Sequence, residues 1–178
     1  MIHEPEILYG IDMPINDIQK ILENIILKKG KGILGEKWDE CNIYGRIYKN
    51  LRNGIYIPEI YISNGEYREI FIDDREHAEI GFYVKNDTVN YNHITSDIDV
   101  IVTVNYEKMK KYYNIEYLKT IMLKWLYETR MLEIGRIKNG VDEVFAEFDR
   151  DRYKYRDIYP FGIISIETQL TYSTSLCV

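Results

Sequence analysis

Residues 98–104 alternate in side-chain character more regularly than any other stretch, and this alternation constrains the fold most. Successive side chains of a β-strand point to opposite faces, so the stretch predicts a strand with two different faces. One face carries only β-branched residues, namely Ile98, Val100, Val102 and Val104. The other face is mixed, with Asp99, Ile101, Thr103 and Asn105. The apolar face needs a cover, which indicates a sheet packed against helices.

Two amphipathic stretches predict helices that provide such a cover. We expect the first over about 14–29, where Pro14 fits the first turn and apolar side chains recur at helical spacing. We expect the second over about 115–133, where Asn114 caps the start and Gly135 closes the end. A third, shorter helix is expected after Gly140, with the apolar positions Val141, Val144, Phe145 and Phe148.

Short β-rich runs fill residues 42–84. The dipeptides Asn53-Gly54 and Asn64-Gly65 punctuate them, and Asn-Gly between such runs is a strong hairpin signal. Pro58 lies inside one run, which predicts an edge strand or a bent one. The chain also has an alternating strand near its end, with Ile164, Ile166, Leu170 and Tyr172 on one face. We therefore predict a single α+β domain over 1–178, with a mainly antiparallel sheet covered by helices.

Composition narrows the function classes without choosing one. The chain has 178 residues, of which 46% are hydrophobic and 29% charged, as in ordinary soluble domains. No run reaches the roughly 18 apolar residues of a membrane-spanning helix. The net charge of −6 disfavours broad, charge-driven binding to nucleic acid. Cys41 and Cys177 are too few for a disulfide framework or a four-cysteine zinc site, which favours synthesis in a reducing compartment.

The glycine-rich stretch 30–37 shares only its spacing with a phosphate-binding loop. Gly30 and Gly35 are five residues apart, but Glu36 occupies the place of the lysine that such a loop needs. A carboxylate there would repel a phosphate. We expect a flexible surface or contact loop at 30–37 instead of a nucleotide site.

The densest polar cluster spans 73–79 and offers carboxylates and an imidazole. It lies between two strand runs, where a charged hairpin tip is the ordinary outcome. A metal-dependent nuclease would use Asp73, Asp74, Glu79 or Asp99, but the Glu-x-Lys pattern of restriction-type nucleases does not follow Asp99. No serine or cysteine motif accompanies the histidines, which we expect in loops. We predict no catalytic residue, no metal and no cofactor, and hence no enzyme.

The charged segment 149–157 has a more unusual pattern. In an extended conformation one side would carry Arg150, Arg152, Lys154 and Arg156. The other side would carry Asp149, Asp151, Tyr153, Tyr155 and Asp157. An exposed segment, a protein contact strip anchored by tyrosine and arginine, and a single-stranded nucleic-acid surface all fit this pattern.

The order of the elements resembles that of one group of virion proteins. A helix, a strand set and the stretch 96–105 precede a second helix, and the motifs 145–149 and 157–161 precede the final strand. Over about 15–177 this order resembles the head-to-tail connector and tail-completion ring proteins of tailed bacteriophages, especially the small ring proteins of crAss-like phages. Their fold is similar to that of phage tail terminators.

The resemblance implies a non-enzymatic virion protein, made in the cytoplasm of the bacterial host. Its copies would close into a six- or twelve-fold homo-oligomeric ring next to the portal and neighbouring neck or tail rings. DNA would pass through the lumen without sequence-specific binding, and no membrane would be involved. We expect contacts between subunits at Lys31, Ile33, Leu34, Lys37, Arg150, Arg152, Tyr153, Tyr155 and Arg156. The alternatives are an intracellular metal-dependent nuclease and a host-cell adaptor that binds another protein.

Overall fold

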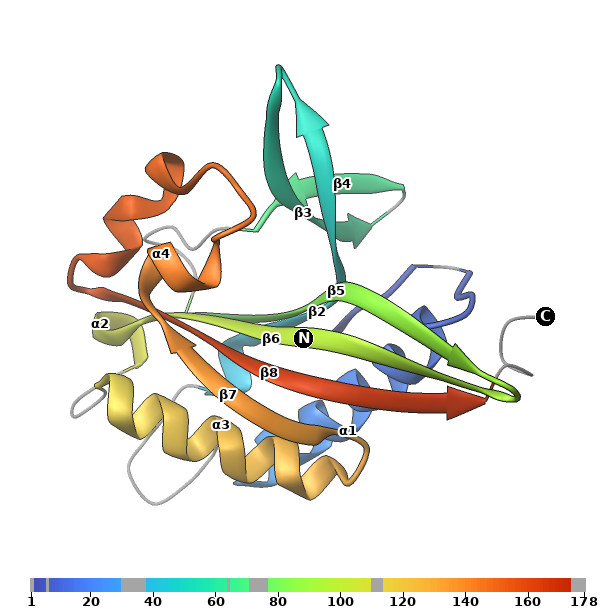
Figure 1. Cartoon of the computed structure of the whole chain (residues 1–178). Helices are drawn as coiled ribbons and strands as arrows, with labels where there is room; N and C mark the ends of the chain where they lie inside the picture. Colours follow the sequence, from blue (N-terminus) through green and yellow to red (C-terminus); the bar gives the residue numbers. More distant parts are fainter. Residues whose placement is uncertain are drawn as a thin grey trace.

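A computed structural model describes residues 2–5, 7–29, 38–63, 65–70, 77–109 and 114–173 of the chain. These residues form one sheet of eight strands with helices packed on it (Figure 1). The strands are β1 (Ile2–His3), β2 (Cys41–Arg52), β3 (Ile55–Ser63), β4 (Glu66–Glu69), β5 (Ala78–Asn90), β6 (His93–Asn105), β7 (Glu133–Asn139) and β8 (Phe161–Ser173). The helices are α1 (Asp12–Lys29), α2 (Tyr106–Met109), α3 (Ile115–Thr129) and α4 (Gly140–Val144), with 3₁₀ turns η1 (Trp38–Glu40) and η2 (Arg150–Asp157). The predicted single-domain α+β fold is confirmed.

The sheet is mostly antiparallel, in the order β4-β3-β2-β5-β6-β8-β7 with β1 beside β2. Among the described strands, the parallel pairs are β1 with β2 and β2 with β5. At its centre β6 pairs with β8 along 13 residues, from His93 opposite Ser173 to Asn105 opposite Phe161. The predicted strand 98–104 is the inner part of β6, and its residues are buried on both faces.

Helices α1 and α3 cover one face of the sheet and build the main core there (Figure 1). The β-branched face of β6 lies in this core, as its alternation predicted, together with the predicted inward positions of β8. Trp38 and Trp125 meet edge to face with ring centroids 4.9 Å apart, which ties η1 to α3. The first helix thus lies where the sequence placed it, and its side chains Ile15, Ile18 and Leu22 are almost completely buried.

A second, smaller core covers one end of the opposite face. There α4, η2 and the β3–β4 hairpin pack on Ile101 of β6. The predicted apolar positions after Gly140 all belong to this core, although the regular helix ends at Val144. The β2–β3 hairpin turns at Asn53 and Gly54, with φ of 51° and 83°, as the Asn-Gly signal predicted. Among the described residues, neither core cluster covers the rest of this face.

Two boundaries differ from those predicted. Helix α3 ends at Thr129, because Arg130 adopts a left-handed conformation with φ of 56°. Gly135 lies inside strand β7, which pairs with β8. The sequence pattern did not indicate this strand, because the helix was predicted to continue to about residue 133. The segment predicted to be extended at 149–157 is instead the 3₁₀ turn η2, because Tyr153 packs on Phe145 with ring centroids 4.6 Å apart.

His3 and His93, expected in loops, lie in strands β1 and β6. The glycine-rich stretch 30–37 and the acidic residues of 73–76 lie outside the described residues. In the part of the chain that the structure describes, no helix is both long and apolar enough to span a bilayer.

A glycine at the start of β8 permits a close approach that any side chain would block. A Cβ atom at Gly162 would contact the Tyr106 hydroxyl and lie 2.7 Å from the ring carbon Cε2. We expect Gly162→Ala to lower the free energy of unfolding by about 1–3 kcal/mol, since the ring must move. Urea denaturation measures this change. The matched control is Gly45→Ala in β2, whose Cβ would meet Gln19 Oε1 at an ordinary 3.4 Å; equal losses in both variants would contradict the explanation.

Candidate functional site

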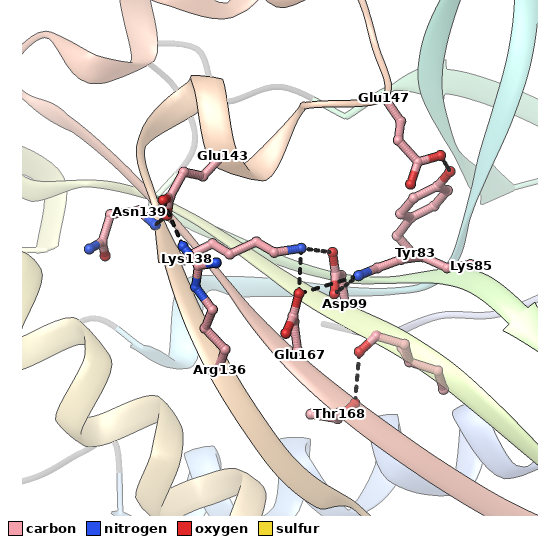
Figure 2. A network of polar contacts seen from close by, with 11 residues as sticks. Tyr83, Lys85, Asp99, Arg136, Lys138, Asn139, Glu143, Glu147, Glu167 and Thr168 are labelled. Carbon is pink, nitrogen blue, oxygen red and sulfur yellow. Dashed lines mark hydrogen bonds and ion pairs between the residues drawn. The ribbon is translucent and has the colours of Figure 1, made fainter.

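Four charged side chains form a network on the partly open face of the sheet (Figure 2). Lys85 Nζ from β5 lies 2.7 Å from Asp99 Oδ1, and Lys138 Nζ from β7 lies 3.0 Å from Asp99 Oδ2. Glu167 of β8 closes the network, with its Oε1 atom 2.8 Å from Lys138 Nζ and 3.7 Å from Lys85 Nζ. Two ammonium groups thus balance two carboxylates.

Strand register brings these residues together from four strands. Asp99 is opposite Tyr83 on β5 and opposite Glu167 on β8. The pairing of β5 with β6 shifts between Val84 and Asn86, at the position of Lys85. The Asp99 residue is only 3% exposed. A carboxylate buried to this extent is costly without cations, so the two lysines are what allows a charged side chain at this position.

Two members of the network, Lys138 and Glu167, have shifted pKa values that keep them charged around neutral pH. Burial lowers the pKa of Lys138, but hydrogen bonds to Glu167 and Asp99 outweigh burial and raise its pKa above the ordinary value. The hydrogen bond from Lys138 lowers the pKa of Glu167, against the smaller opposing effect of burial. A general acid or base needs a pKa near the working pH, so neither group is suited to that role.

A pocket of about 370 Å³ opens beside the network on the same sheet. It is lined by Lys85, Asn86, Asp97, Ile98, Asp99, Glu133, Ile134, Gly135, Glu167, Thr168 and Gln169. The pairing of β7 with β8 shifts between Ile134 and Ile137, and Gly135 at this irregularity has no side chain. Asp97 accepts a hydrogen bond from Gln169 Nε2 at 2.9 Å. The lining is rich in carboxylates, and no sequence motif predicted this cluster.

Of the acidic residues of the nuclease alternative, the structure describes Glu79 and Asp99 and does not bring these two together. Glu79 is opposite Thr103 on β6, four residues from Asp99, which is about 13 Å along the strand. Arg68 Nη2 binds the fully buried Glu79 at 2.5 Å, just as lysines hold Asp99. Within the described residues, no group of three or more His, Cys, Asp or Glu is placed to hold a metal ion. Asp73 and Asp74 lie outside those residues.

The predicted contact residues of the charged segment differ in their surroundings. Arg150 is exposed, with Nη1 3.9 Å from Asp142 Oδ1. Arg152 donates to Glu69 Oε2 at 2.9 Å. Tyr153 is 1% exposed and donates to Glu69 as well, so its prediction as a surface contact is wrong.

The other predicted contact positions lie outside what the structure describes. They are the loop residues Lys31, Ile33, Leu34 and Lys37, and the side chains of Tyr155 and Arg156.

Two exposed apolar tips are features that the sequence reasoning missed. Val89 and Tyr91, at the β5–β6 hairpin, are 68% and 96% exposed. Ile158 and Tyr159, just before β8, are 65% and 70% exposed. The β6–β8 register places these tips at opposite ends of a 13-residue pair, about 40 Å apart. Asn residues on both sides of Tyr91 were the signal that marked its turn.

Comparison of the chain with models of known protein families gave no match, and a search of curated proteins gave none either.

Removing one cation of the network should destabilise the fold. We expect Lys138→Met to lower the free energy of unfolding by about 1–3 kcal/mol, because the buried Asp99 keeps only Lys85 as a cation. The control is Arg136→Met in the same strand, whose pair with Glu143 is largely exposed and should matter by less than about 0.5 kcal/mol. Urea denaturation at pH 7 distinguishes the two variants, and similar losses would contradict a special role for the network.

Acid should weaken the fold partly through Glu167. Its pKa is lowered in the folded state, so the stability it contributes is present above its ordinary pKa of 4.5 and lost as the pH falls through the lowered value. The pKa values of Glu59 and Glu147 are lowered too, through hydrogen bonds from Arg52 and Lys49. We expect the melting temperature to fall between pH 5 and pH 3, and to fall less steeply in Glu167→Gln. An equally steep decline in that variant would show that Glu167 does not contribute.

Proposed function

We propose that the chain is a structural virion protein that forms a ring in the head-to-tail connector of a tailed bacteriophage. Six or twelve copies would join the portal to the tail and leave a lumen through which DNA passes. The observation that carries this proposal is the pair of apolar tips at opposite ends of the β6–β8 pair. A closed ring needs two different surfaces on each subunit, since each interface joins one surface to the other.

The chemistry of the tips supports an interface of this kind. Tyr91 and Tyr159 are large and amphipathic, and tyrosine is enriched among the residues that dominate binding energy at protein interfaces. Each tip also carries an aliphatic side chain whose burial would stabilise an interface, Val89 on one and Ile158 on the other.

The charges support passage of DNA through the ring over tight binding to it. Each subunit carries a net charge of −6, and a ring multiplies this charge. A negative field repels the phosphates of DNA, so the duplex would not adhere to the subunits. The main charged network is internally balanced and supports a structural role, because Lys85 and Lys138 are already engaged by carboxylates.

Quantitative mass spectrometry of purified particles from the source of this chain tests the proposal. We expect six or twelve copies per particle relative to the major capsid protein, in a ring that a symmetric reconstruction of the neck would show. Absence from clean particles would contradict the proposal. Magnesium-dependent cleavage of DNA by the purified chain would favour the nuclease instead, and binding to a host protein would favour the adaptor.

The tips provide a matched set of variants for the same measurement. We expect Tyr91→Ser and Tyr159→Ser each to lower the number of copies per particle about tenfold, since each removes an interface anchor. Tyr127→Ser is the control, because Tyr127 is 65% exposed on α3, on the helical face of the sheet. Equal incorporation of all three variants would contradict a role for the tips.

A further inference from the structure

We infer that the acidic pocket beside the Lys85–Lys138 network receives Arg150 from a second copy of this chain. The inference rests on the proposed ring and deepens it, because it names the polar contact between neighbouring subunits. The apolar tips would supply burial, and this contact would supply register and orientation.

The pocket carries more negative charge than its own lysines neutralise. Lys85 and Lys138 are engaged by Asp99 and Glu167, so this set of four is neutral. Two further carboxylates of the lining have no cation within ion-pair distance among the described residues, namely Asp97 and Glu133. The pocket therefore has a surplus of two negative charges and is complementary to a cation.

The spacing of the two carboxylates suits an arginine side chain. Asp97 and Glu133 both stand opposite Gln169, on either side of β8. Their side chains thus flank one row of the sheet, about 10 Å apart at the backbone. A planar guanidinium has five donors and can contact carboxylates on two sides, which an ammonium group does less well.

The turn η2 carries the most suitable cation in the described part of the chain. Its eight residues include four basic and two acidic ones. Arg152 is engaged by Glu69 and Lys154 by Asp151 within the same chain. Among the described residues, the ion pair of Arg150 is a loose one with Asp142, at 3.9 Å, in which both side chains are more than half exposed. Arg150 is thus available for a partner at little cost.

The two surfaces lie far apart in one chain, which favours contact between chains. Turn η2 packs in the second core, near the start of β8. The pocket begins at Glu167, six residues after Phe161, which is about 20 Å along the strand. Both surfaces are on the same side of the sheet as Ile101. Because they are this far apart within one chain, we expect one copy to offer the cation and the next copy to offer the pocket. This head-to-tail arrangement is what a closed ring requires.

The inference can be tested with two variants, each of which keeps one half of the contact. Arg150→Glu keeps the acidic pocket, and the double variant Asp97→Lys with Glu133→Lys keeps the basic turn. We expect each to self-associate at least tenfold more weakly than the unmodified full-length chain in sedimentation velocity at low salt. Mixed together, they should associate in equal amounts, because each variant then offers its residue 150 to a pocket of opposite charge. All three substitutions in one chain should restore part of the self-association for the same reason.

Controls separate this contact from general charge effects and from misfolding. Lys124→Glu on α3 and Glu107→Lys on α2 change the net charge by the same amount per residue at exposed positions with no ion pair among the described residues. They should associate as the unmodified chain does, and all variants should keep its melting temperature within a few degrees. Near-ultraviolet circular dichroism verifies the fold of each variant before association is measured.

Three outcomes would overturn the inference. They are variants that self-associate as well as the unmodified chain, a mixture that stays monomeric, and an unmodified chain that is monomeric even at millimolar concentration. None of these refutes the proposed ring, which depends on copies counted in particles. If the chain is present in particles but these results are obtained, the pocket faces another protein or solvent. If it associates as expected but is absent from particles, the contact stands and the ring in a phage neck fails.

Discussion

The 13-residue pairing of β6 with β8 is the interaction on which the rest of the structure depends. It contributes to both cores, because the inner part of β6 packs against helices α1 and α3 on one face and, at Ile101, against α4 and η2 on the other. It also fixes the distance between the two apolar tips and the alignment of the charged network. A slip by one residue would exchange the two faces and destroy all three features together.

The mixed face of β6 carries a buried carboxylate, and the network supplies the cations that neutralise it. Asp99 is almost completely buried, and a carboxylate there requires cations that arrive from neighbouring strands. Lys85 and Lys138 come from strands on either side of the β6–β8 pair, at or next to places where the regular pairing shifts. Gly135, at the irregularity of β7, also lines the adjoining pocket.

Several parts of the fold and few parts of the site were predictable from the sequence. The alternation of 98–104, the stripe of the first helix and the Asn53-Gly54 turn are local patterns, and the structure agrees with each. The end of α3 was predicted too late because Gly135 looked like a helix stop, whereas Arg130 adopts the left-handed conformation. Tyr153 was misplaced because its burial depends on Phe145, which packs beside it only after folding.

The sequence by itself determined the class of fold, since hydrophobic periodicity and turn residues act over a few positions and need no knowledge of distant partners. The network, the acidic pocket and the position of the tips were decided by tertiary structure alone. Lys85, Asp99, Lys138 and Glu167 span more than 80 positions and share no local motif. Only strand order and register bring them within ion-pair distance, because side chains from four strands meet on one face of the sheet.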